Sequence, residues 1–195
     1  MSRLFLFSIF FVYSCNLINS FNYIETARNL VLGFDDFEIT QEYYNSQSFS
    51  FAKVRFGSGP PVIVTLAEVE NNRFLWVSSD RSFIYTENGR VTQTIGLPRN
   101  SRIINSESEE SFTFLYENPD GAFRAYRDVI KVPSSFIYSY RGNEIEVTKF
   151  IEKITIPELD LEHKNTYLYG KNGLVFTEQI INPYLDPIRI EFHLK

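Results

Sequence analysis

The sequence predicts an all-β fold, an antiparallel sandwich or barrel-like fold of about ten strands with a short N-terminal helix. From Ser48 onward, apolar and polar residues alternate with period two, which is typical of half-buried strands. Turn motifs interrupt this alternation, most clearly at Asn88-Gly89 and at Asn118-Pro119-Asp120-Gly121. Strands do not alternate with helical segments, so a parallel α/β sheet is not expected.

Helical signals precede the strands. Asn22 and Glu25 resemble a helix-capping arrangement, and apolar residues then recur at helical spacing as far as Gly33, which can end a helix. These features predict a short amphipathic helix over residues 23–32. A second short helical turn is indicated around residues 41–45.

The predicted strands are grouped around turn motifs. Further turns are expected at Arg141-Gly142-Asn143 and at Lys171-Asn172-Gly173.

The last strand alternates so regularly between apolar and polar residues that His193 is predicted to face solvent. The acidic stretch at residues 106–111 is interpreted as an exposed loop between two halves of the domain. Strands are predicted at residues 73–77, 82–87, 90–95, 111–117, 122–132, 135–140, 144–155, 165–169, 174–181 and 188–194.

The N-terminus has the pattern of a targeting segment. Arg3 is followed by an apolar run that ends near Tyr13, as in a secretory signal peptide. Val12-Tyr13-Ser14-Cys15 resembles a lipobox, although Tyr13 is bulkier than usual, and Cys15 is the single cysteine of the chain. We therefore predict a signal peptide at 1–14, a lipidated tether at 15–21 and one all-β domain at 22–195. The alternative is an ordinary signal peptide that is cleaved elsewhere.

The amino-acid composition and the strand pattern argue against several classes of protein. The formal net charge is −5, which argues against a nucleic-acid partner because such binders need a basic footprint. One cysteine cannot form an internal disulfide or a Cys-rich metal site. The strands do not show consistently apolar outer faces over the length that a membrane-spanning barrel requires. Aromatic residues make up 16% of the chain, enough to fill a β core.

Residues for catalysis are sparse. The two histidines have no ligand-like spacing, and His163 is predicted to lie in a solvated loop. Asp35-Asp36 is the obvious carboxylate pair for glycoside hydrolysis, but adjacent side chains usually point apart. We therefore expect no enzyme activity, no catalytic residue, no metal site and no cofactor.

Recognition by aromatic side chains near turns is a remaining possibility. Tyrosine offers an apolar ring with a polar tip, which suits sugars as well as protein interfaces. The candidates are Tyr138, Tyr140, Tyr167 and Tyr169, together with Arg90 of the Asn-Gly-Arg turn.

A family resemblance covers nearly the whole mature chain. Trp76-Val77-Ser78-Ser79-Asp80, Asn88-Gly89-Arg90 and Gly96-Leu97-Pro98 resemble motifs of the YjbF/GfcB lipoproteins, which are encoded with exopolysaccharide and group 4 capsule genes of Gram-negative bacteria. Tyr167-Leu168-Tyr169 and Ile190-Glu191-Phe192 are similar to that family's C-terminal part. These motifs mark strands and turns and specify no chemistry.

The resemblance implies a lipoprotein of the outer membrane that faces the periplasm. It implies support of the assembly or export of an extracellular or capsular polysaccharide through contacts with other envelope proteins, including an outer-membrane β-barrel protein and a periplasmic partner. A polysaccharide-binding module and a polysaccharide-modifying enzyme are the alternatives.

Overall fold

The computed structural model describes Arg28 and residues 33–108, 110–117 and 120–195. The predicted signal peptide, Cys15, the tether and all of the helix predicted over 23–32 except Arg28 lie outside the described residues. The chain divides into two units. In the described part of the first unit, Arg28 pairs with Asp35 at 3.1 Å, and the Phe34 N–H donates to the carbonyl of Ser58 at 3.0 Å.

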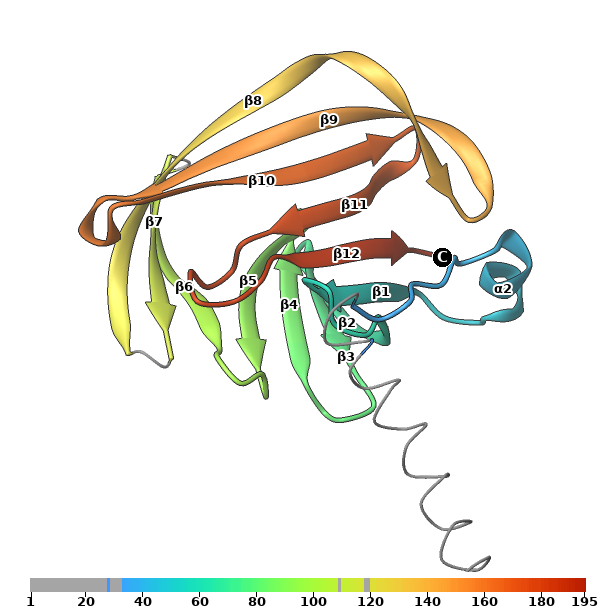
Figure 1. Cartoon of the computed structure of the whole chain (residues 1–195), viewed down its shortest axis with the longest axis horizontal. Coiled ribbons are helices and arrows are strands. Elements are labelled where there is room, and N and C mark those ends of the chain that lie inside the picture. Colours follow the sequence, from blue (N-terminus) through green and yellow to red (C-terminus); the bar gives the residue numbers. More distant parts are fainter. Residues whose placement is uncertain (1–27, 29–32, 109, 118–119) are drawn as a thin grey trace, which may run out of the picture. The chain divides into compact units, whose positions relative to one another are not determined.

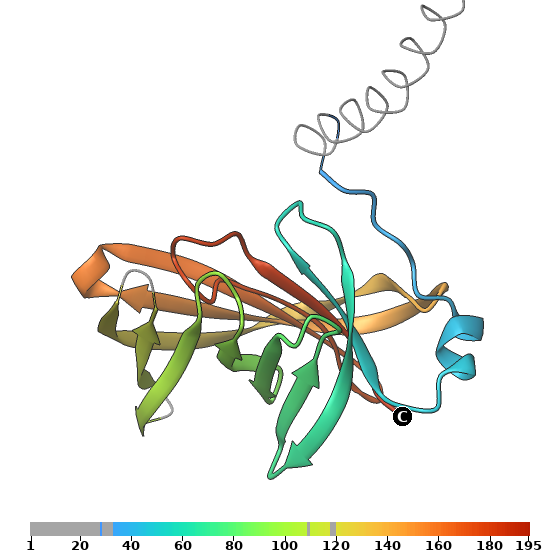
Figure 2. The same cartoon turned by 90° about the horizontal axis from the view of Figure 1, so that it is seen from below.

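The second unit, residues 37–57 and 61–195, is an all-β barrel, which confirms the predicted fold class. Its twelve described strands are antiparallel and follow chain order, and the barrel closes where β1 pairs with both β2 and β12 (Figures 1 and 2). The strands are β1 (Phe51–Phe56), β2 (Val62–Glu70), β3 (Arg73–Val77), β4 (Phe83–Glu87), β5 (Arg90–Ile95), β6 (Ser101–Ser108), β7 (Ser111–Tyr116), β8 (Gly121–Tyr140), β9 (Asn143–Ile156), β10 (Leu161–Gly170), β11 (Gly173–Gln179) and β12 (Ile188–His193). The helix α2 (Gln41–Ser46) precedes β1, as its sequence indicated, and a 3₁₀ turn, η1 (Pro157–Leu159), joins β9 to β10.

Aromatic and branched side chains fill the core of the described barrel in three clusters, of which the two largest show how the rings pack. One lies around Trp76, whose indole N–H donates to the Thr86 hydroxyl at 2.9 Å and whose ring packs against Phe192. The other contains the stacked pair Phe114 and Tyr116. The aromatic excess of the sequence thus serves mainly to fill a barrel that small side chains would leave hollow.

The predicted Asn88-Gly89 hairpin is confirmed. Both residues have positive φ, 48° and 82°, as a two-residue type I′ turn requires. The turn lies against β11, because a Cβ at Gly89 would come 2.0 Å from a methyl carbon of Leu174. Glycine is therefore favoured here by backbone conformation, and an added Cβ would also require the Leu174 side chain to shift.

Gly89→Ala is expected to destabilise the protein by about 2 kcal/mol, since it combines left-handed backbone strain with a clash. Gly142→Ala is the matched control, because Gly142 also has positive φ (70°) but no atom within 4 Å of an added Cβ. That control is expected to cost only about 1 kcal/mol. Urea unfolding of both variants measures the difference, and equal losses would contradict the packing of this turn against β11.

Several strand boundaries differ from the predictions, and two of the differences change how the strands are connected. The segments predicted as separate strands at 122–132 and 135–140 form one strand, β8, which shifts register between Lys131 and Ser135. The acidic stretch at 106–111 is not a boundary between halves, because β6 continues to Ser108, β7 begins at Ser111, and the two strands pair. That prediction was wrong because a hairpin turn and an interdomain loop share the same polar composition.

The prediction that His193 faces solvent was also wrong, since its side chain is fully buried. The ring of His193 stacks on Phe51 on one side and on Tyr140 on the other, with interplanar angles of 22° and 1°. Tyr140 comes from the end of the β8–β9 hairpin, and Tyr44 of α2 lies close by. The alternating pattern assigned His193 to the outer face of β12. In the structure, the end of the β8–β9 hairpin and helix α2 cover that face.

Candidate functional site

A charged cluster lies inside the barrel around Glu152 of β9, whose side chain is only 2% exposed. Arg90, at the start of β5, forms an ion pair and hydrogen bond with the Glu152 Oε1 atom, and Arg127 of β8 lies 3.5 Å from the same oxygen. On Oε2, the Asn165 amide donates at 3.0 Å and the Tyr167 hydroxyl at 2.8 Å. A buried carboxylate is stable only with such compensation, so the cluster depends on all of these strands together.

Gln179 of β11 extends this polar interior toward the Asn88-Gly89 turn. Its amide nitrogen donates to the Gly89 carbonyl at 2.7 Å, and its oxygen accepts from the Val91 N–H at 3.0 Å. Because both bonds are buried, they tie the β4–β5 turn across the barrel to β11. This attachment is what brings Arg90 to Glu152, which lies 62 residues further along the chain.

Sequence reasoning missed Glu152, although a signal for it exists. Phe150, Glu152, Ile154 and Ile156 share one face of β9, and Ile154 and Ile156 are fully buried. A carboxylate in the middle of an apolar period-two run indicates either an interrupted strand or a buried ion pair. The partner arginines could not be assigned, because nothing local connects them.

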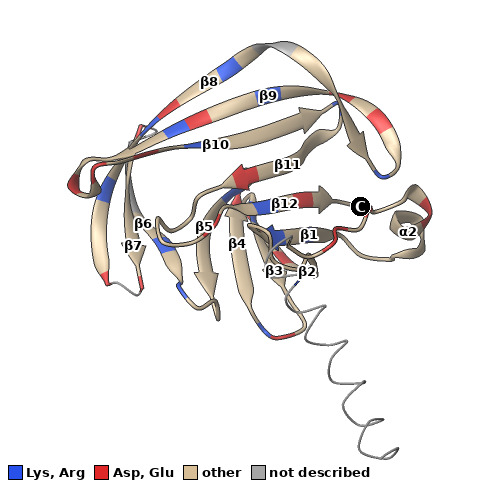
Figure 3. Ribbon diagram, viewed as in Figure 1, with Lys and Arg blue, Asp and Glu red and all other residues tan. Residues whose placement is uncertain are grey.

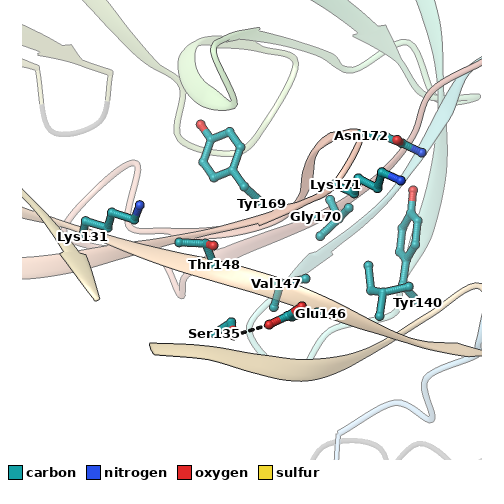
Figure 4. A pocket seen from close by; sticks show the side chains of 12 residues that line it. Lys131, Ser135, Tyr140, Glu146, Val147, Thr148, Tyr169, Gly170, Lys171 and Asn172 are labelled. Carbon is teal, nitrogen blue, oxygen red and sulfur yellow. Dashed lines mark hydrogen bonds between the residues drawn. The ribbon is translucent and has the colours of Figure 1, made fainter. Parts of the chain in front are cut away.

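Two adjoining cavities open beside this cluster. The first, of about 670 Å³, is lined by Arg90, Arg127 and Glu152 and by aromatic side chains that include Phe150 and Tyr167. The second, of about 800 Å³, lies between the β10–β11 turn and the β8–β9 hairpin (Figure 4). The two cavities share the lining residues Lys131, Thr148, Tyr169 and Gly170.

The structure places most of the predicted recognition residues on these cavities. Arg90 and Tyr167 line the first cavity, Tyr140 lines the second, and Tyr169 lines both. Tyr167 is nearly inaccessible, at 7% exposure, and burial beside the Glu152 charge raises its pKa, so it stays protonated and donates a hydrogen bond to that carboxylate. Tyr169 is the half-buried member whose ring edge meets Phe150 at 5.3 Å between centroids.

Tyr138 lies apart from both sets of lining residues. Its ring packs against Phe176 at 5.8 Å, and its hydroxyl lies 3.5 Å from Glu191 of β12. Tyr140 itself donates to the Phe192 carbonyl, and burial raises its pKa to about 12. These two tyrosines therefore also hold the end of the β8–β9 hairpin against β12.

His163 contradicts its predicted place in a solvated loop, since it lies in β10 opposite Ile154 and is 7% exposed. The charged residues around it occupy the outward positions of a strand, which explains why the segment resembled a loop. Burial lowers the pKa of His163, opposed by the nearby Glu152 charge. Burial likewise lowers the pKa of His193, opposed by Glu191.

Stability is expected to fall as the pH decreases from 7.5 toward 5.5. Both histidines have folded-state pKa values below the unfolded value of about 6.5, so only the unfolded chain takes up protons as the pH drops through that value. Replacing His163 and His193 with glutamine removes every histidine of the chain. Thermal melts across this pH range should show a flatter profile for the double variant, and an unchanged slope would contradict the burial of the two rings.

The carboxylate pair considered for glycoside hydrolysis belongs to the first unit. Asp35 and Asp36 are exposed, and Asp35 pairs with Arg28. Within the part of the chain that the structure describes, histidine, aspartate and glutamate side chains form no group of three suited to a metal ion. No helix among the described residues has the length and hydropathy needed to cross a membrane.

Comparison with known proteins identifies relatives of this barrel. A family model described as "Group 4 capsule polysaccharide lipoprotein gfcB, YjbF" matches residues 24–192. The chain is 22% identical over 107 residues to the uncharacterized lipoprotein GfcB of Escherichia coli strain K12, a match that covers 55% of this chain and half of that protein. It also resembles the crystal structure of the hypothetical lipoprotein YmcC from E. coli K12, with a TM-score of 0.69 at 15% identity, covering 88% of this chain and 95% of the other. The chain therefore belongs to the group 4 capsule polysaccharide lipoprotein family of GfcB and YjbF.

Proposed function

We propose that this protein is a non-enzymatic lipoprotein of the outer membrane, facing the periplasm, that supports assembly or export of a capsular polysaccharide through contacts with other envelope proteins. Family membership supports the polysaccharide role, and the signal peptide with Cys15 supports the lipid anchor. An outer-membrane β-barrel protein of the same system is the partner that the family resemblance suggests.

The observation that carries the protein-contact role is an exposed apolar surface on β8. Three apolar and aromatic side chains share one face of this strand, on both sides of its register shift, because their partners on β9 alternate along a single face; all three are at least 39% exposed. Apolar groups gathered in this way are typical of interaction surfaces, whereas single exposed ones are ordinary. We call this set the β8 surface; it consists of Tyr126, Ile130 and Phe136.

Site-specific photocrosslinking tests this role directly. A photoreactive amino acid at Ile130, which is 50% exposed, should capture another envelope protein in cells of the native strain. The same probe at Glu162, an exposed position on β10, is the control and should capture far less. Equal labelling from both positions, or no envelope protein from Ile130, would contradict a partner at the β8 surface.

A further inference from the structure

The two adjoining cavities have the size and continuity of one ligand site. Volumes of about 670 and 800 Å³ each lie in the range of pockets that hold drug-sized molecules. The two cavities are continuous, because both are lined by Lys131, Thr148, Tyr169 and Gly170. A ligand in one cavity can therefore extend into the other. The site therefore suits an extended molecule better than an inorganic ion.

Positive charge gathers along this wall although the chain as a whole is acidic. The linings of the two cavities contain the cations Arg90, Arg127, Lys131 and Lys171 and the carboxylates Glu87, Glu146 and Glu152, an excess of one cation in a chain of net charge −5. Figure 3 shows basic and acidic residues along β8 and β9.

The individual charges differ in what they contact. Glu152 is held by the two arginines, whose side chains remain 21% and 23% exposed, and Glu146 accepts a hydrogen bond from Ser135 (Figure 4). Lys131 is exposed and lies where the cavities meet. It is therefore the cation best placed for an anionic group of a ligand.

Aromatic rings lie next to that cation. The Lys131 ammonium is 5.9 Å from the centroid of Phe150, which contacts Tyr169 edge to face. Tyr169 is half-buried, so it presents an apolar ring together with a hydroxyl to both cavities. An acidic sugar matches this combination of aromatic surface and positive charge, because its ring has an apolar face and carries several hydroxyls and a carboxylate.

We propose that the two cavities form one binding site for an acidic oligosaccharide, with Lys131 contacting a sugar carboxylate and Tyr169 packing against a sugar ring. The choice of a sugar rests on the polysaccharide role proposed above. The protein contacts of the β8 surface are a separate matter, so crosslinking and sugar binding can fail independently.

Titration calorimetry on the full chain purified in detergent tests this site. The acidic probes are oligosaccharides of galacturonate, mannuronate and hyaluronan, and the neutral probe is maltohexaose. At least one acidic probe should bind at least tenfold more tightly than maltohexaose, and its affinity should fall with added salt because the contact is electrostatic. Absence of binding by every acidic probe, or equal binding of maltohexaose, would overturn the proposal.

Variants locate the binding. Lys131→Gln is expected to weaken the acidic probe about tenfold, as is Tyr169→Ala, whereas Tyr169→Phe should retain most of the affinity because it keeps the ring. Lys153→Gln is the control, since it removes the same charge from a lysine that pairs with Glu162 and does not line the cavities. Thermal melts confirm that each variant is folded. Equal effects of Lys131→Gln and Lys153→Gln would show that binding depends on net charge alone and would overturn the site.

Discussion

Glu152→Gln is expected to lower the free energy of unfolding by about 3 kcal/mol, the largest effect of any single charge in the barrel. The substitution keeps the shape of the side chain but removes its charge. Arg90 and Arg127 then lose the carboxylate that compensates them, and Tyr167 loses a charged acceptor at 2.8 Å. Breaking a buried pair on one side is costly because the remaining charges stay poorly solvated.

Glu162→Gln provides the matched comparison. Glu162 pairs with Lys153 at 2.9 Å, but its side chain is 53% exposed, so water replaces the lost contact. We expect a change of no more than about 0.5 kcal/mol for this variant. Urea unfolding of both variants at the same pH measures the contrast. If Glu152→Gln lowers the free energy of unfolding by less than about 1 kcal/mol, the charged cluster around Glu152 does not hold the β4–β5 turn in place.

Cys15→Ser is expected to release the protein from the membrane, because the cysteine is the single candidate for acylation. Each buried methylene of an acyl chain contributes about 0.8 kcal/mol to membrane binding, so several chains on one residue anchor firmly. Fractionation of cells after labelling with radioactive palmitate measures both anchoring and acylation. Asn19→Ser is the control for a change in the same segment and should stay membrane-bound and labelled.

Retention of Cys15→Ser in the membrane with unchanged lipid incorporation would refute the lipoprotein prediction for this residue. In that case the leader would act as an ordinary signal peptide, and the family's anchoring would have to use another feature of the chain.

Local chemistry explains which parts of the fold could be predicted. The hairpin at Asn88-Gly89 followed from its residues, because a type I′ turn requires positive φ at both positions. By contrast, separate strands were predicted at 122–132 and 135–140, on either side of Pro133. The structure accommodates it within β8 by a register shift between Lys131 and Ser135, which alternation alone does not reveal.

The candidate site was predictable only in part, for a related reason. Arg90, Tyr167 and Tyr169 were predicted as recognition residues because they lie near turns, and all three line the first cavity. Their organising partner, Glu152, comes from a distant strand, and closure of the barrel brings them together. His193 illustrates the same limit, since period two assigns a face of the strand but not the chain that covers it.

Capsular polysaccharide at the cell surface provides the most direct test of the proposed role. Deletion of the gene from the native strain should strongly reduce surface polysaccharide, and the full-length protein should restore it. Restoration should fail for a variant with Ile130→Asp and Phe136→Asp on the β8 surface, whereas the folded Lys153→Gln control should restore it fully. Normal surface polysaccharide in the deletion strain would contradict a role in polysaccharide assembly or export.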